Sequence, residues 1–209
     1  LLANVASMYA VYHGPAGLRQ IAHRIRGLTL RVAEGLKKLG CQLENELFFD
    51  TLYVKSQELS PEQILANCQT QGINLRRFPD GAFGISLDEP TSASDITRLL
   101  KVFSKTEHLP FTLDDLSQEI TSTIPSPFLR TTPFLTHEVF NLHRSETEML
   151  RYLKQLENKD FSLTHGMIPL GSCTMKLNAT TEMLPVTWPE FADIHPFAPD
   201  EQTVGYRTM

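Results

Sequence analysis

The sequence lacks the features that mark several large classes of protein. No apolar run approaches the roughly 20 residues that a membrane-spanning helix needs, and the first residues do not form a secretory signal peptide. The net charge is -5, with basic and acidic residues interspersed, whereas a nucleic-acid-binding surface requires clustered lysine and arginine. These absences predict a soluble protein with no membrane partner and no nucleic-acid partner.

Cysteine is also scarce. Cys41, Cys68 and Cys173 have no spacing typical of a metal site, and an odd number makes a poor disulfide framework, so we expect a reducing compartment. The histidines before residue 165 likewise show no metal-ligand spacing, and the chain contains no P-loop and no dinucleotide-binding fingerprint. Arg76 and Arg77 are able to bind an anion, but a solvated strand edge fits these two residues better.

The chain contains patterns that predict a long helix followed by a strand over its first 54 residues. Apolar residues recur at three- and four-residue steps between Pro15 and Gly40, which is typical of an amphipathic helix opened by proline and ended by glycine. A short apolar strand is expected near residues 48–54. Residues 1–10 read as the middle of a buried helix, and the last five residues lack a cap, so we expect a segment of a larger protein.

Residues 60–106 predict a helix, a β-hairpin and a second helix. Ser60 begins a capping box, and Gly72 ends the helix that follows it. The tripeptide at 79–81, Pro-Asp-Gly, separates two apolar runs and is typical of a hairpin turn. Ser92 is a candidate cap for the last helix. Together these elements predict a compact α+β domain over residues 1–106, within the α/β to α+β classes.

The remainder of the chain has a different character. Residues 107–133 combine several prolines with serine and threonine, which predicts a linker that lies across a surface. Ser145 begins a capping box that predicts a helix to about residue 158, and a short helix is expected near residues 178–183. The proline-rich stretch at 185–197 predicts an extended aromatic arm, which needs a large partner domain to bury its rings.

The densest group of reactive side chains lies in the predicted loop 167–178. Gly171 allows a close backbone approach, and the small residues after it leave backbone N–H groups free to converge on a carboxylate or phosphate. Lys176 adds a positive charge beside them. An ordinary strand-to-helix turn with a buried thiol accounts for the same residues.

His165, Cys173, Lys176 and His195 form the candidate site, because all four lie in predicted irregular backbone. Cys173 is either a nucleophile activated by Lys176 or a buried, inert thiol. Lys176 either anchors a substrate carboxylate or is a solvated cation, and its neighbours do not indicate the desolvation that a Schiff base requires. His195 is more typical of a residue hydrogen-bonded to the backbone of the arm.

Several stretches of the chain closely resemble the P-protein of the glycine cleavage system. The resemblance runs in register across nearly the whole chain and is weakest in the linker. The stretches that carry it are residues 1–15 (LLANVASMYAVYHGP), 135–141 (LTHEVFN), 145–152 (SETEMLRY), 168–178 (IPLGSCTMKLN) and 185–191 (PVTWPEF).

This resemblance implies a pyridoxal-phosphate enzyme that decarboxylates glycine and passes the aminomethyl group to the lipoyl arm of the H-protein. The family's chain has two halves, each similar to fold-type I aminotransferases, and a homodimer is expected. Residues 1–106 then correspond to the small C-terminal subdomain of the first half, residues 107–133 to the linker, and residues 134–209 to the N-terminal arm and helix of the second half. The implied partners are the lipoylated H-protein and the rest of the chain, in the cytoplasm of a bacterium or the mitochondrion of a eukaryote.

The chain departs from the family pattern at one decisive point. The family's Schiff-base lysine belongs to a His-Lys pair followed by a glycine-rich run, and no His-Lys pair occurs in these 209 residues. The resemblance therefore places the catalytic lysine beyond Met209 and predicts that the segment alone is inactive. A free-standing, non-catalytic α+β interaction module is the alternative, and another fold-type I enzyme, such as an aminotransferase, fits the loop motif less well.

The resemblance carries over candidate site residues only where the motif matches. The candidate cavity-lining residues are Ser172, Cys173, Thr174 and Lys176. The weaker candidates are His165, Asn178 and His195.

Overall fold

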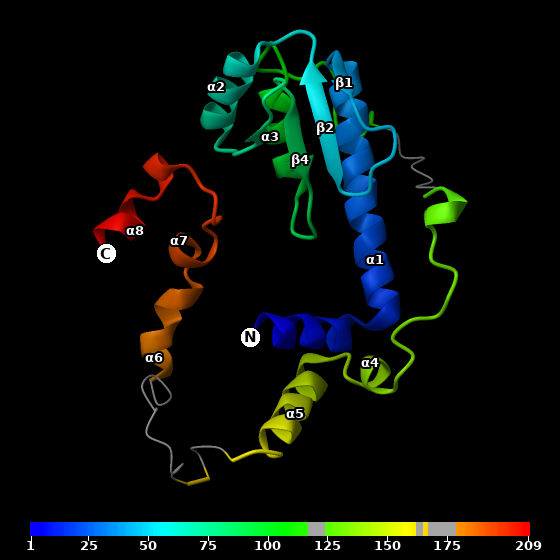
Figure 1. The fold of residues 1–209 in the computed structure, drawn as a ribbon, viewed down its shortest axis with the longest axis vertical. Helices are drawn as coiled ribbons and strands as arrows, with labels where there is room; N and C mark the ends of the chain where they lie inside the picture. The colour runs from blue at the N-terminus through cyan, green and yellow to red at the C-terminus, as the bar shows by residue number, and fades with distance from the viewer. Residues whose placement is uncertain (117–123, 162–164, 167–178) are drawn as a thin grey trace. The chain divides into compact units, whose positions relative to one another are not determined.

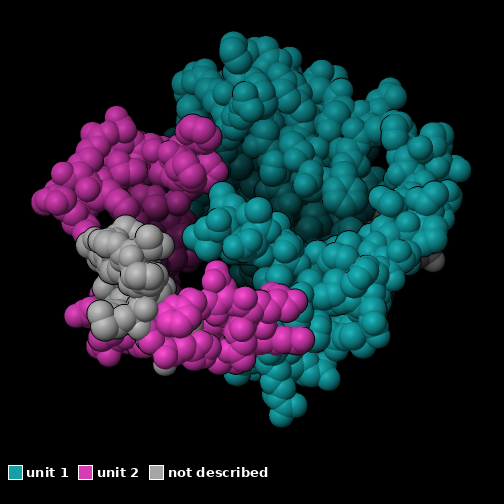
Figure 2. Space-filling model, turned by 60° about the horizontal axis from the view of Figure 1, so that its bottom comes forward, with its two compact units in different colours: residues 1–152 teal, residues 153–209 magenta. Residues whose placement is uncertain are grey.

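The computed structural model describes residues 1–116, 124–161, 165–166 and 179–209 (Figure 1). The chain divides into two compact units, Leu1–Tyr152 and Leu153–Met209, which Figure 2 colours separately. Helices are combined with one small antiparallel sheet, which confirms the mixed helix-and-sheet class. The domain boundaries drawn from the family resemblance, at residues 106 and 133, stay a prediction.

The first element, α1 (Leu2–Lys38), is a 37-residue helix interrupted by a kink. At Gly14 the backbone takes φ 56° and ψ -172°, a left-handed conformation that favours glycine, and Pro15 follows without an N–H to donate. The limb after the kink confirms the predicted helix that begins at Pro15. Gly40, at φ 76°, then turns the chain into the first strand.

Four short strands form an antiparallel sheet in the order β1-β2-β4-β3. Their bounds are Cys41–Leu43 for β1, Thr51–Ser56 for β2, Arg76–Arg77 for β3 and Phe83–Ser86 for β4. The predicted hairpin is confirmed, because β3 pairs with β4 and the Gly81 N–H donates to the Phe78 carbonyl across the turn. The predicted strand at 48–54 begins later, at Thr51, and β1 was not predicted.

Alternation along the two central strands sends one set of side chains into the core. Leu52 lies opposite Ile85, and Val54 lies opposite Phe83, and all four are essentially fully buried. Tyr53, between the two buried residues of β2, points to the other face of the sheet. This face is therefore the one that carries polar and aromatic side chains.

Both predicted helix caps beside the sheet are confirmed. Helix α2 (Pro61–Gln71) begins at Ser60, whose Oγ accepts from the Gln63 N–H at 3.2 Å while the Gln63 side chain accepts from the Ser60 N–H. Helix α3 (Ala93–Val102) begins with the same arrangement between Ser92 and Asp95. Each cap satisfies N–H groups that the first turn of a helix leaves without partners.

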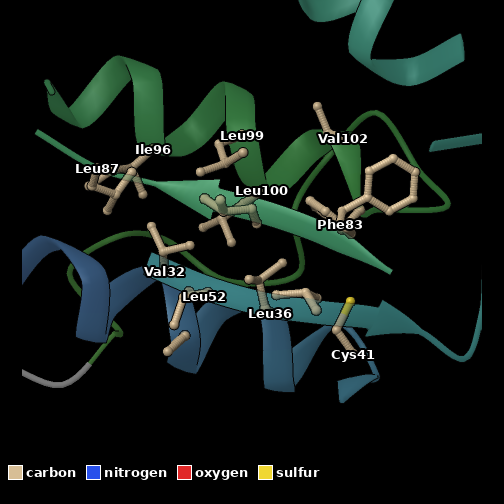
Figure 3. Packing of buried hydrophobic residues seen from close by; sticks show 14 of the residues in the cluster. Val32, Leu36, Cys41, Leu52, Phe83, Leu87, Ile96, Leu99, Leu100 and Val102 are labelled. Atoms are coloured by element: carbon tan, nitrogen blue, oxygen red, sulfur yellow. The ribbon is translucent and has the colours of Figure 1, made fainter. Parts of the chain in front are cut away.

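The core lies where side chains of α1, α3 and one face of the sheet meet (Figure 3), and Ile64 and Cys68 of α2 belong to the same cluster. Helices α1 and α3 touch at Gly35, where the absent side chain makes room for Leu100. The linker also contributes, since Leu116 is fully buried and packs with Leu113 against this core. The largest fully buried side chains are Phe83, Phe103, Leu36, Leu52, Ile64, Ile85, Ile96, Leu100, Leu116, Val32, Val54 and Val102.

The rest of the described chain consists of short helical segments. The predicted helix at 145–158 is confirmed by α5 (Glu146–Glu157), and no residue of α5 is buried. The other segments are η1 (Ser126–Phe128), α4 (Val139–Leu142), α6 (Thr180–Met183), η2 (Leu184–Thr187), α7 (Pro189–Ala192), η3 (Asp200–Gln202) and α8 (Val204–Thr208). Within the described ranges, no helix combines the length and apolar character needed to cross a membrane.

The expectation of an extended arm at 185–197 is wrong for its first part. Residues 184–192 form the two helical turns η2 and α7 instead. Pro185 and Pro189 lie in the first turn of these segments, where the missing N–H has no helical partner to lose. The prolines therefore start short helices here and do not prevent them.

Two glycines of α1 provide a matched test of the core. We predict that Gly35→Ala destabilises the first unit by about 1–3 kcal/mol, because a Cβ there would lie 2.8 Å from Leu100 Cδ2. Gly27→Ala is predicted to stabilise it by about 0.5–1 kcal/mol, because a Cβ would meet nothing within 4 Å and alanine favours the helix. Denaturant unfolding measures both changes, and a stabilising Gly35→Ala would contradict the packing described.

Candidate functional site

Most of the predicted site falls outside the part of the chain that the structure describes. The residues concerned are Ser172, Cys173, Thr174, Lys176 and Asn178. Of the two remaining candidates, His165 is an exposed residue in a turn. The proximity of these residues in space thus stays a prediction.

His195 has a local structural contact. It is exposed, its Nδ1 accepts a hydrogen bond from the backbone N–H of Phe197 at 3.0 Å, and the two rings lie 5.8 Å apart. This geometry agrees with the interpretation of His195 as a residue that orders the backbone of the arm. A nitrogen that already accepts a backbone hydrogen bond is less available as a proton acceptor for a substrate.

The second unit exposes a large share of its apolar side chains. Phe197 is 90% exposed and Trp188 is 52% exposed, while Phe191 and Tyr206 pack against each other with ring centroids 6.0 Å apart. The Tyr206 hydroxyl also donates to the Phe191 carbonyl. An apolar surface of this kind is typical of a segment that packs against another part of a protein.

The two described cysteines are poor nucleophiles. Cys41 and Cys68 are buried in the core, and burial raises the pKa of each thiol to about 11. A thiol with such a pKa is protonated at neutral pH, and the thiolate is the reactive form. Both residues therefore act as small apolar side chains in the core.

Four of the described lysines do not fit covalent attachment of a carbonyl cofactor, which requires a desolvated amine and not one paired with a carboxylate at the surface. Lys55 donates a hydrogen bond to Asp80 at 2.8 Å, and this bond raises the pKa of its amine, whereas a Schiff-base lysine needs a lowered pKa. Lys38, Lys105 and Lys154 also form ion pairs on the surface. Nor does any group of three or more histidine, cysteine, aspartate or glutamate residues in the described ranges form a metal site.

The outer face of the sheet carries a small polar and aromatic cluster. Asp80 in the hairpin turn accepts hydrogen bonds from Lys55 and from the Tyr53 hydroxyl, which lower the pKa of Asp80 to about 2. Arg77, on the edge strand β3, pairs with Glu62 at 2.8 Å, and Arg76 stacks on Phe78. The two arginines thus match the solvated strand edge and not an open anion site.

One structural contact that sequence patterns did not reveal lies at the kink of α1. The Arg144 guanidinium donates to the His13 carbonyl at the kink and to the Phe140 carbonyl of α4 at 2.7 Å. A Cβ at Gly14 would collide with this guanidinium, so glycine is needed both for its φ angle and for the space. Arg144 therefore links two segments that are 131 residues apart in the chain.

The limb of α1 before the kink bears a second long-range contact. The Tyr9 hydroxyl donates to the Glu89 carboxylate at 2.5 Å, and this hydrogen bond raises the pKa of Tyr9 to about 12. Arg24 supports the same loop by donating to the carbonyls of Glu89 and Thr91. A shallow apolar groove beside Tyr9 is lined by Asn4, Val5, Met8, Tyr12, His13 and Met149.

These arrangements define a small α+β domain followed by helical segments, a class that supports many functions. Comparison with known proteins is more specific. The glycine cleavage system P-protein family matches residues 1–103. The whole chain is 56% identical to glycine dehydrogenase (decarboxylating) of Nostoc punctiforme and of Aliivibrio salmonicida, and 52% identical to the mitochondrial glycine dehydrogenase (decarboxylating) of Solanum tuberosum.

The chain thus belongs to the glycine cleavage system P-protein family, as its sequence motifs predicted. It spans about a fifth of the length of the relatives it matches, with 22% of the Nostoc protein and 20% of the Solanum protein covered. The whole chain therefore corresponds to one segment of each relative.

The Asp80 cluster predicts a pH dependence of stability. Because the folded protein holds the pKa of Asp80 below its ordinary value of 3.8, the cluster stabilises the fold above about pH 4 and loses this effect as the pH falls towards 2. Asp80→Asn should flatten the stability profile in that window, while Asp114→Asn, at an exposed carboxylate, serves as the control. Acid titration of unfolding checks this, and identical profiles for Asp80→Asn and the unmodified protein would contradict it.

Removal of the Arg144 side chain is predicted to loosen the chain locally, around the kink of α1 and in α4. Arg144→Met removes the donors to His13 and Phe140, so backbone hydrogen exchange should accelerate around the kink and in α4, with a loss of about 1 kcal/mol in local stability. Arg151→Met, at an exposed arginine of α5, is the matched control. Unchanged exchange in both regions would show that the contact does not hold the kink.

Proposed function

We propose that this chain works as a segment of a pyridoxal-phosphate-dependent glycine decarboxylase, which releases CO₂ from glycine and passes the aminomethyl group to the lipoyl arm of the H-protein. The observation that carries the proposal is the identity of 52–56%, over the whole chain, to proteins named glycine dehydrogenase (decarboxylating). Identity at this level over the whole chain supports a shared activity of the complete proteins.

In this proposal the loop 167–178 lines the active-site cavity of the complete protein. Ser172 or Thr174 contacts substrate or cofactor, Lys176 sets the local positive potential, and Cys173 lines the same cavity. Such a loop orients the carboxylate of glycine and must not bind it so tightly that the loss of CO₂ is opposed. The basis for this assignment is the sequence motif.

The cofactor proposed for the complete protein is pyridoxal phosphate, attached to a lysine beyond this chain. The surface ion pairs of Lys38, Lys55 and Lys105 support this placement, as does the absence of a His-Lys pair from the sequence. The segment alone is then inactive. Its contribution is to position and shape the site.

The proposed architecture follows the fold-type I enzymes. Residues 1–106 form the small subdomain of the first half, and residues 134–209 form the arm that opens the second half. The proposed partners are the rest of the same chain, the lipoylated H-protein and a second copy in a homodimer. The exposed Trp188 and Phe197 support burial of the arm against another surface.

The compartment depends on the source of the protein. The Solanum relative is described as mitochondrial. We propose a cytoplasmic location if the protein is bacterial and a mitochondrial one if it is eukaryotic.

Substitutions in the loop test the proposal in the full-length enzyme. Ser172→Ala and Lys176→Ala should each lower the exchange of CO₂ with the carboxyl group of glycine by about tenfold or more, because each removes an interaction with the reacting substrate. Ser126→Ala and Lys159→Ala, at exposed residues outside the motif, are the matched controls. Unaltered exchange rates in both loop variants would sink the assignment of the loop.

A further inference from the structure

One charged side chain in the core region of the first unit has no charged or hydrogen-bonding partner among the residues that the structure describes. Arg26, on α1, is only 8% exposed, and its Nε and Nη1 atoms are closed to solvent and make no hydrogen bond in the described part of the chain. The third nitrogen of the guanidinium, Nη2, is not among these buried atoms that lack a hydrogen bond. The arginine therefore keeps one open edge.

Two other arginines of the same unit have polar partners. Arg24 donates to two backbone carbonyls, and Arg77 pairs with a carboxylate. Arg26 has only the face of the Phe48 ring, 4.4 Å from its guanidinium carbon, and burial lowers the pKa of Arg26. A cation–π contact offsets only part of the desolvation of a buried charge, so a carboxylate beside Nη2 would remove a real penalty.

The segment around Phe48 presents apolar side chains outwards. Leu47 is 58% exposed and Phe49 is 40% exposed, on either side of Phe48 in the loop between β1 and β2, which lies beside α1 (Figure 1). The loop is held in place by Asn45, whose side chain donates to the Thr51 carbonyl and accepts from the Tyr53 N–H. The exposed apolar side chains of Leu47 and Phe49 therefore lie in an ordered loop next to the buried guanidinium of Arg26.

We propose that Arg26 and the loop 44–50 form a docking site for a part of the full-length protein outside these 209 residues, which places a carboxylate at Arg26 and apolar side chains on Leu47 and Phe49. The inference rests on the proposed function, in which the chain is one segment of a longer enzyme. Two observations select this occupant. The chain covers only 22% of its Nostoc relative, and the site combines an uncompensated positive charge with exposed apolar surface.

The direction in which Arg26→Met changes the stability of the full-length protein tests the docking site. If Arg26 is unpaired, Arg26→Met removes a buried charge and leaves the protein equally or more stable. If a carboxylate pairs with Arg26, the same change exposes an unpaired acid and lowers the midpoint of thermal unfolding by about 2 °C or more. Arg31→Met, at an exposed arginine of the same helix, controls for the loss of a positive charge.

A second variant avoids any dependence on Arg26 itself. Leu47→Ser combined with Phe49→Ser alters side chains that the segment leaves exposed, so it should have little effect unless another surface covers them. The docking site predicts at least tenfold faster hydrogen exchange in residues 44–50 for this variant and for Arg26→Met. Unchanged exchange and an unchanged or raised unfolding midpoint in both would overturn the proposal.

A small anion is the competing occupant, and inorganic phosphate is the probe for it. If phosphate raises the unfolding midpoint of the unmodified protein, and Arg26→Met abolishes this shift, the site is open to free anions and docking of the chain is wrong. No phosphate effect, together with destabilised Arg26→Met, supports docking. These readouts do not involve catalysis, so a full-length protein without CO₂ exchange would refute the proposed function and leave this test intact.

Discussion

The fold of the first unit depends on the close packing of α1 against α3 and the sheet. This contact is possible because Gly35 leaves room for Leu100, so that two helices and the buried faces of β2 and β4 share one apolar layer. Val32 and Leu36 of α1 are fully buried there, and Leu52 meets them from the sheet. The same helix extends beyond the core, which lets it carry both the kink at Gly14 and the buried Arg26. Packing in the core thus positions the features that make long-range contacts.

Those contacts tie together segments that lie far apart in the sequence. Arg144 joins the kink of α1 to α4, Tyr9 bonds Glu89, and Leu116 enters the core from the linker. As a result, Leu1–Tyr152 forms one compact unit that includes residues assigned by resemblance to both halves of the family's chain. In the proposed enzyme, this arrangement would hold the start of the second half against the small subdomain of the first.

Local patterns made the secondary structure of the first domain predictable. The capping boxes at Ser60 and Ser92 and the turn at Gly81 are encoded within a few residues, and each is present in the structure. Strand β1 escaped prediction because three residues are too few to show an alternating pattern. The roles of Arg26 and Arg144 escaped it for another reason, since an unpaired or a bridging guanidinium is defined by neighbours distant in the chain. The candidate loop at 167–178 rests on its motif alone.

The most direct test of the account is to locate the attachment site of the cofactor in the full-length protein. Sodium borohydride fixes pyridoxal phosphate to the lysine that holds it, and peptide mass spectrometry then identifies that residue. We expect a labelled lysine beyond residue 209, in a His-Lys pair, with Lys176 unmodified. Labelling of Lys176, or of any other lysine within residues 1–209, would contradict the claim that this segment shapes the site without carrying the cofactor.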